Sequence, residues 1–283
     1  MRDYYSAHTL NPPSALEAEL IALGLYDYEY KEKTLGSGVI TSFIRIKIPI
    51  DDSRLPDILG LKQKYQLLGT YYTEFDDDDY ADATWLEAEI VSWIGYPKPE
   101  NSWQEVTYDL THPDYCRKCG AGFVQINPFR FAKSHERGKT IHFCQPGWVY
   151  DALFVRSRVK DELTTQGIKS IDFLPAIEAG SKKSFEDVIQ ILFGHVMGPA
   201  LLNTEDFPSE VCTQCQRRKW VPMKRVNRFN RTSFSDQLDM VLTHEWFGSG
   251  ALAYRKILVS RRFAELLQER RWRGLRLRPI VLE

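Results

Sequence analysis

The chain has 283 residues, of which 43% are hydrophobic and 27% charged, so it is long enough for two folded domains of common size. No apolar run approaches the ~18 residues that a membrane helix needs, which excludes a membrane-spanning protein. The N-terminal residues lack the basic start, apolar stretch and cleavage pattern of a secretion signal, so we expect a cytoplasmic protein.

The net charge of −1 conceals two oppositely charged parts. Residues 1–110 carry 20 acidic and 9 basic side chains, whereas residues 111–283 carry 18 acidic and 28 basic ones. We therefore predict an acidic α+β region over residues 1–110 and a basic α+β domain over residues 111–283. Such segregation indicates two domains that attract each other or a face for a charged partner, and plain solvated surface is the alternative.

The acidic region begins with a predicted helix. Ser14 and Glu17 form a capping box, and Gly24 ends the helix. Residues 38–50 alternate isoleucines with basic residues and a proline, which predicts a strand with one buried face at the edge of a sheet. A second helix is predicted from residue 53 to residue 68.

Four consecutive aspartates, Asp76–Asp79, form the densest charge cluster of the chain. Their spacing does not match a calcium loop, so a solvated loop is the default interpretation. The alternative is an acidic surface, flanked by aromatic residues, that docks on a basic partner or on the basic part of the same chain. Two prolines within residues 96–103 predict a linker near the charge boundary.

The cysteines carry the strongest chemical signal. All five lie in the basic domain, and four of them form two C-x-x-C pairs, Cys116 with Cys119 and Cys212 with Cys215. Because cytoplasmic thiols stay reduced, such pairs indicate metal ligation. Two intervening residues let a tight turn, a zinc knuckle, aim both sulfurs at one ion, and two knuckles complete a tetrahedron. We predict one zinc ion bound by these four residues.

A closed site of four thiolates leaves no position for water or substrate, so this zinc would be structural rather than catalytic. A redox C-x-x-C pair and simple burial of small side chains are the alternatives. Gly120 provides the positive φ that a knuckle turn often needs, whereas Gln216 stands at the matching position of the second pair. Cys144 is a spare thiol that could replace a ligand together with His142, although a buried structural role is the preferred interpretation.

Two segments of the basic domain resemble each other, residues 152–176 and residues 255–282. In each, an apolar run ends at a serine suited to cap a helix, Ser157 or Ser260. An amphipathic helix, a glycine and an apolar strand follow. We predict two pseudo-repeated knuckle–strand–helix–strand units joined by the zinc site, with a chance match as the alternative.

No catalytic motif is recognisable. His244 and Glu245 begin like a zincin helix, but Gly248 occupies the position of the second histidine. The sequence contains no nucleophile elbow, Walker loop or dinucleotide fingerprint. Arginines between residues 261 and 278 could neutralise phosphates. We therefore weigh a non-catalytic protein-binding protein against a zinc-ribbon protein that binds nucleic acid, and against an enzyme whose cleft carries no local motif.

From about residue 115 to residue 283, the chain resembles the bacterial double-CxxCG motif proteins. The resemblance rests on four segments in a fixed order: CRKCG, CTQC, THEWFGSG and the C-terminal ILVSRRF with WRGLRLRPIVL. Gln216 departs from the second glycine of the family. The resemblance implies a cytoplasmic bacterial protein of the immunity type, which neutralises a contact-delivered toxin by covering it. Residues 1–110 lie outside the resemblance.

Overall fold

The computed structural model shows a mixed α and β fold with more strand than helix. No described helix is both long enough and apolar enough to cross a lipid bilayer. The structure describes residues 1–25, 29–34, 40–132, 141–181 and 183–283.

The chain packs as two compact units. Unit 1 comprises Met1–Asp79 and Met223–Val226, and unit 2 comprises Tyr80–Pro222 and Asn227–Glu283. The short second segment of unit 1 is tied to the first by several contacts. Its Lys224 carbonyl accepts a hydrogen bond from the Thr73 N–H (2.9 Å), and Arg225 forms an ion pair with Asp3 (3.2 Å).

Unit 1 is a four-stranded antiparallel sheet with two helices. The sheet order is β2-β3-β1-β4, and the element order β-α-β-β-α-β makes this the ferredoxin-like split β-α-β arrangement. The elements are β1 (Arg2–Leu10), α1 (Ser14–Ala22), β2 (Glu29–Thr34), β3 (Ile40–Pro49), α2 (Leu55–Tyr65) and β4 (Leu68–Glu74).

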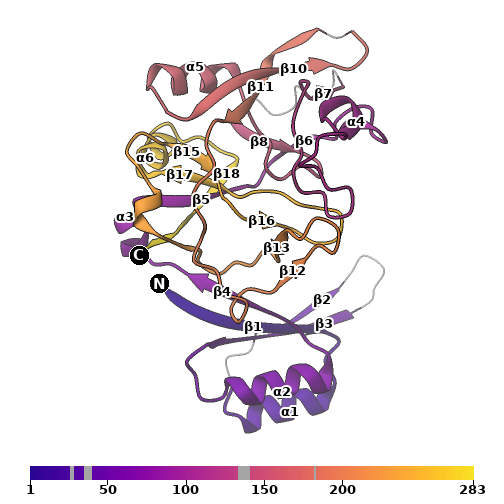
Figure 1. Ribbon diagram of the computed structural model, residues 1–283. Coiled ribbons are helices and arrows are strands. Elements are labelled where there is room, and N and C mark those ends of the chain that lie inside the picture. The colour runs from indigo at the N-terminus through magenta and orange to yellow at the C-terminus, as the bar shows by residue number, and fades with distance from the viewer. Residues whose placement is uncertain (26–28, 35–39, 133–140, 182) are drawn as a thin grey trace. The chain divides into compact units, whose positions relative to one another are not determined.

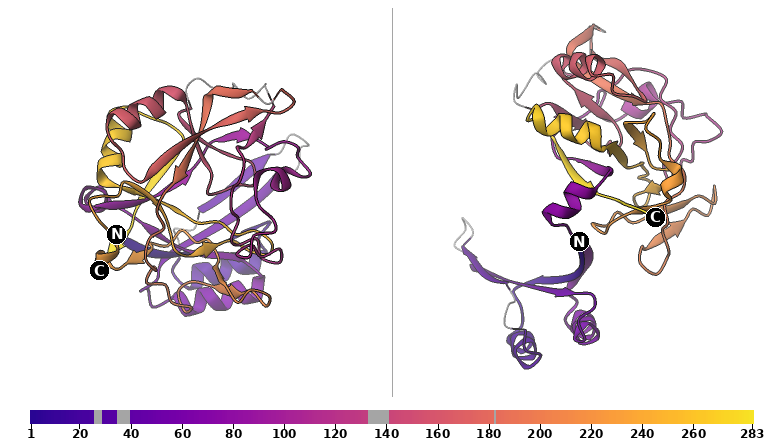
Figure 2. Two further views of the ribbon diagram at one scale, coloured as in Figure 1. Left: turned by 45° about the horizontal axis from the view of Figure 1, so that its top comes forward. Right: turned by 90° about the vertical axis from the view of Figure 1, so that its left-hand side faces the viewer.

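Strand β3 shows why this sheet has one covered face. Ile44, Ile46 and Ile48 alternate along it and are buried, because α1 and α2 both lie against that face (Figures 1 and 2). The predicted edge position of this strand is wrong, since β3 pairs with β2 on one side and β1 on the other. Pro49 is tolerated there because it is the last residue of the strand. Residues 38 and 39 of the predicted strand lie outside the described residues.

Two local predictions in the acidic region need correction. Pro13, not Ser14, is the N-cap of α1, and no side chain caps that helix. The four aspartates do not form a loop, because α3 (Asp77–Asp82) begins within them. The N–H of Asp79 donates to the Asp76 carboxylate and the N–H of Asp76 donates to the Asp79 carboxylate, both at 2.9 Å. Carboxylates at a helix N-terminus are favourable because the free N–H groups there carry partial positive charge.

The described residues of unit 2 form four sheets. Their strand orders are β6-β8-β9-β11-β10-β7, β15-β17-β5-β18, β12-β13-β16 and β14-β19. The helices are α4 (Trp103–Thr107), α5 (Ser157–Thr165) and α6 (Arg261–Glu269), with a 3-10 turn at Arg231–Ser233. The strands are β5 (Trp85–Ile90), β6 (Trp93–Gly95), β7 (Arg130–Phe131), β8 (Phe143–Pro146), β9 (Leu153–Val155), β10 (Ile171–Glu178), β11 (Ser184–Phe193), β12 (Ser209–Val211), β13 (Arg218–Trp220), β14 (Arg228–Phe229), β15 (Met240–Leu242), β16 (Trp246–Phe247), β17 (Ile257–Ser260), β18 (Leu275–Pro279) and β19 (Val281–Leu282).

The division between the units falls at residues 79 and 80, before the predicted boundary at residues 110 and 111. The cause is β5, which lies between β17 and β18 and so joins the acidic segment to the C-terminal sheet. Opposite charges meet there, since Glu87 pairs with Lys256 at 3.0 Å and Glu89 with Arg276 at 3.5 Å. Some acidic residues of the N-terminal part of the sequence therefore form ion pairs with basic residues of the C-terminal part inside unit 2. The predicted linker over residues 96–103 is a loop of the same unit.

The two similar segments form β9–α5–β10 and β17–α6–β18. In each, the two strands flank a third strand that is antiparallel to both, β11 in the first case and β5 in the second. The central strands come from different places in the chain, so a true repeat stays a prediction. The two helices contribute to one core: Val159, Leu163, Phe263, Ala264, Leu266 and Leu267.

Candidate metal centre

Unit 2 brings the four predicted cysteines together. All four Sγ atoms lie within 4.8 Å of one another, although 92 residues separate the two pairs in sequence. The Cys116 and Cys212 sulfurs are 3.8 Å apart, and the Cys119 and Cys215 sulfurs 3.7 Å. Four sulfurs at ~2.3 Å from a central ion at tetrahedral angles are ~3.8 Å apart, so the spacing suits a tetrahedral metal ion. This group of residues could hold a metal ion.

The two C-x-x-C turns have the same backbone hydrogen bonds. In the first, the Gly120 N–H donates to the Cys116 carbonyl (2.8 Å), and the Cys116 N–H donates to the Ala121 carbonyl (2.9 Å). In the second, the Gln216 N–H donates to the Cys212 carbonyl (2.9 Å), and the Cys212 N–H donates to the Arg217 carbonyl (2.9 Å). Each turn thus directs its two cysteines toward the same point.

Gln216 adopts the conformation that the first turn reaches with glycine. Its φ is 59°, compared with 76° for Gly120, so the departure from C-x-x-C-G does not change the turn. Left-handed backbone costs an L-residue about 1–2 kcal/mol, a strain that the surrounding turn must hold. Glycine is needed for a second reason in the first turn. A Cβ on Gly120 would lie 2.1 Å from the carbonyl oxygen of Ala251.

Backbone N–H groups favour the thiolate form at the first cysteine of each turn. The N–H groups of Cys215 and Gln214 lower the pKa of Cys212 to about 6. Burial opposes ionisation of Cys116, yet the N–H groups of Cys119 and Lys118 leave its pKa below the ordinary value. Burial raises the pKa of Cys119 to about 12. Metal binding would have to remove that proton, because metal ligation requires the thiolate.

A buried lysine supports the centre from β13. The side chain of Lys219 is 1% exposed, and its Nζ donates to the carbonyl oxygens of Cys119 (3.3 Å), Gly250 (2.5 Å) and Leu252 (3.2 Å). It also forms an ion pair with Glu210 at 2.9 Å. The ammonium group links the first knuckle to the loop after β16. Sequence reasoning missed this residue, because its partners are mainly backbone carbonyls that leave no pattern in the sequence.

Neither of the two spare candidates joins the cluster. Cys144 lies in a separate apolar core with Phe154, and burial raises its pKa to about 12. The Nδ1 atom of His142 accepts a hydrogen bond from the Arg273 N–H at 3.0 Å. Among the described residues, the group that could hold a metal ion consists of the four paired cysteines and includes neither of these two.

The segment that resembled a zincin helix is not a helix. Glu245 is buried just before β16, and its carboxylate accepts a hydrogen bond from the Ala200 N–H at 2.7 Å. The Thr243 hydroxyl donates to the Glu245 carbonyl at 3.1 Å. The Glu245 carboxylate therefore holds the backbone at Ala200 in place. This structural role agrees with the missing second histidine of the zincin motif.

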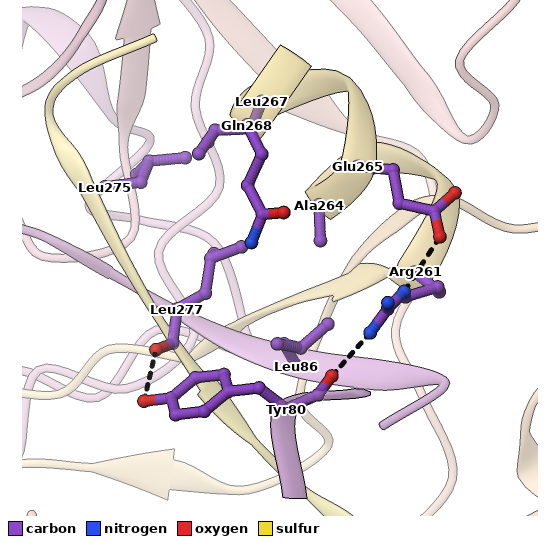
Figure 3. Close-up of a pocket in the computed structure, with 9 residues that line it drawn as sticks. All are labelled: Tyr80, Leu86, Arg261, Ala264, Glu265, Leu267, Gln268, Leu275 and Leu277. Atoms are coloured by element: carbon purple, nitrogen blue, oxygen red, sulfur yellow. Dashed lines mark hydrogen bonds and ion pairs between the residues drawn. The ribbon is translucent and has the colours of Figure 1, made fainter. Parts of the chain in front are cut away.

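A separate cavity of about 230 Å³ lies between α6 and β18 (Figure 3). Its wall is mostly apolar, and at one end the Arg261 guanidinium bonds to Glu265 (2.9 Å) and to the Tyr80 carbonyl. The Tyr80 hydroxyl donates to the Leu277 carbonyl at 3.4 Å. Among the described residues that line this cavity there is no histidine or cysteine, so it does not extend the metal centre. The lining residues are Tyr80, Leu86, Arg261, Ala264, Glu265, Leu267, Gln268, Leu275 and Leu277.

Comparison with known proteins gives no assignment, because no protein-family profile matches the chain and no curated protein is significantly similar to it.

Proposed function

We propose that the four cysteines bind one zinc ion whose role is structural. The supporting observation is the clustering of four sulfurs within 4.8 Å, with two sulfur–sulfur distances of 3.8 and 3.7 Å that equal the edge of a tetrahedral zinc–thiolate site. Thiolate ligands select zinc or iron over hard cations, and a mononuclear closed tetrahedron is the usual structural zinc site. Because protein ligands fill all four positions, the ion would join segments of the chain rather than activate water.

The local architecture explains why such a joint is needed. The second knuckle connects β12 and β13, which with β16 form a sheet whose strands are only two or three residues long. Strands this short provide too few contacts to be stable alone. The first knuckle lies between α4 and β7, a stretch without regular structure. The zinc ion would fix both segments in place.

Substitution of one ligand tests the structural role. Cys212→Ser removes a sulfur, so we expect loss of bound zinc and a thermal midpoint lowered by at least several degrees, measured by elemental analysis and circular dichroism. Cys144→Ser is the matched control, since it changes a cysteine outside the cluster and should retain the zinc. Retention of the full zinc content by Cys212→Ser would refute the assignment.

We further propose that the protein is a cytoplasmic bacterial protein of the immunity type, which binds a toxin partner and blocks it by covering it. Exposed aromatic residues on unit 2 support a binding role. Trp93 is 72% exposed and Trp148 59% exposed, and the ring of Trp148 lies 4.6 Å from that of Tyr96. Tryptophan and tyrosine dominate the binding energy of protein interfaces.

The loop that carries Trp148 is held in an unusual conformation. Trp148 has a φ of 66°, and Gly147 before it leaves room for the Tyr96 ring, which a Cβ would approach to 2.5 Å. Strained backbone that exposes a large apolar ring suggests a use for that ring in binding. We therefore assign the partner-binding surface to Trp93, Tyr96 and Trp148.

The protein encoded by the adjacent gene is the candidate partner for a binding test. It should form a complex with this protein, and the double variant Trp93→Ala with Trp148→Ala should weaken that complex at least 100-fold in a calorimetric titration. Ile126→Ala, at another exposed apolar residue of unit 2, should leave the affinity unchanged. Absence of a complex, or equal affinity of the double variant, would contradict the proposal.

A further inference from the structure

The sheet of unit 1 has a second face that α1 and α2 do not cover (Figures 1 and 2). Side chains alternate along β1, so Tyr5 and Ala7 are buried beneath the helices while Tyr4 and His8 lie on the opposite face. The strand register sets their neighbours. Tyr4 stands opposite Tyr72 of β4, and His8 stands opposite Arg45 of β3.

Aromatic rings form two groups on this face. The rings of Tyr4 and Tyr72 are stacked, with centroids 5.7 Å apart and an interplanar angle of 22°. The rings of His8 and Phe43 have centroids 5.8 Å apart. All four side chains are partly exposed. Flat rings held by neighbouring strands are the surface on which unpaired bases stack.

Cations lie among these rings. The Nζ atom of Lys47 lies 4.2 Å from the centroid of the Tyr4 ring, and the Arg45 guanidinium bonds to the Ser6 hydroxyl at 3.2 Å. Arg45 is exposed, and the Lys47 side chain is 41% exposed. Both groups therefore reach solvent on the same face as the rings, where they could neutralise phosphates.

For the part of unit 1 that the structure describes, the charge of this face is opposite to that of the unit as a whole. Among the described side chains, Glu74 is the carboxylate on the face, and it is paired with Lys47 at 2.7 Å. The other described carboxylates lie mainly on α1, on α2, in the turn before α2 and at the start of α3: Glu17, Glu19, Asp51, Asp52, Asp57 and Asp76–Asp79. A locally basic and aromatic surface on an acidic unit is complementary to a polyanion that carries flat rings.

We propose that this face binds single-stranded nucleic acid. The bases stack on the rings of Tyr4, Phe43 and Tyr72, while Arg45 and Lys47 contact the phosphates. A duplex fits less well, because its bases are already stacked on one another and do not present their faces. The proposal is independent of the metal centre and of the toxin-binding role, since it uses unit 1 alone.

Fluorescence anisotropy with the full chain and labelled 12-nucleotide oligo-U and oligo-dT tests this. We expect binding that weakens as salt is added and is stronger than binding to a duplex of the same length. Phe43→Leu keeps an apolar side chain but removes the ring, and should weaken binding about 5-fold or more. The double variant Arg45→Ala with Lys47→Ala should weaken binding and lower the salt dependence by about 1.4 in log–log slope.

Lys62→Ala with Lys64→Ala is the matched control, since it removes two positive charges from α2 on the covered side. It should leave the affinity nearly unchanged, and circular dichroism should show that every variant is folded. Absence of single-strand binding overturns the proposal, as does an equal loss in the control and in the face variants. Loss confined to Arg271→Ala with Arg273→Ala would overturn it as well, because binding would then belong to the basic C-terminal part.

Discussion

At the scale of single residues, the two knuckles reach one geometry with different residues. Gly120 and Gln216 share a left-handed φ and an equivalent hydrogen bond to the first cysteine of the turn. They differ in their surroundings, since a Cβ on Gly120 would meet the Ala251 carbonyl, whereas the Gln216 side chain is exposed and donates to the Thr213 carbonyl at 3.2 Å. Glycine is therefore required sterically in the first knuckle and merely favourable in the second.

Alanine substitutions at Gly120 and at Gln216 test whether glycine is required in the first knuckle only. Gly120→Ala should lower the free energy of unfolding by about 2 kcal/mol or more, because it adds both backbone strain and a clash. Gln216→Ala should change it by less than about 0.5 kcal/mol, because a Cβ is already present. Denaturant titration of the two variants measures both values. Equal losses would show that the two turns are not constrained in this way.

The buried ammonium of Lys219 gives a second test at this scale. Lys219→Met keeps much of the volume but leaves the carbonyls of Cys119, Gly250 and Leu252 without their donor. We expect a loss of about 2–3 kcal/mol in the free energy of unfolding and weaker zinc retention in a competition with a chelator. Arg218→Met, at the neighbouring exposed residue, should cause a smaller loss. A Lys219→Met protein of unchanged stability would contradict the supporting role.

At the scale of elements, the local sequence predicts a serine cap for both α5 and α6, but only the cap of α6 is present. The capping serine of α6 was predicted correctly, since the Ser260 hydroxyl accepts a hydrogen bond from the Phe263 N–H at 3.2 Å. The equivalent prediction for α5 was wrong, because Arg156 is the N-cap and Ser157 bonds to the Asp187 carboxylate. Asp187 lies in β11, 30 residues further along the chain, so a local pattern could not reveal it.

The two serines should therefore respond differently to the same change. Ser260→Ala removes a cap and a 2.6 Å bond to Asp239, and should lower the free energy of unfolding by about 1–2 kcal/mol. Ser157→Ala should cost less than about 0.5 kcal/mol, because its bond to Asp187 is exposed. Thermal unfolding followed by circular dichroism compares them. The reverse order of stability would show that Ser157 has a capping role that the structure does not display.

At the scale of the whole molecule, the clustering of the cysteines could be predicted from the sequence, whereas the long-range pairing of strands could not. Four thiols in two knuckle spacings carry their chemistry in the sequence itself, whatever the length of chain between them. The unit boundary depends on β5, whose partner strands β17 and β18 lie more than 160 residues away in the sequence. Amino-acid composition does not reveal this pairing. The sheet order that places β3 in the interior of unit 1 likewise depends on long-range pairing.

The central claim is that one zinc ion joins the two knuckles, and X-ray absorption at the zinc edge tests it most directly. We predict about one zinc per purified chain and four sulfur neighbours at ~2.3 Å, with no nitrogen or oxygen ligand in the first coordination shell. A protein that contains no zinc and whose thermal midpoint does not rise when zinc is added would contradict the claim. Fewer than four sulfur neighbours would contradict the proposed ligand set.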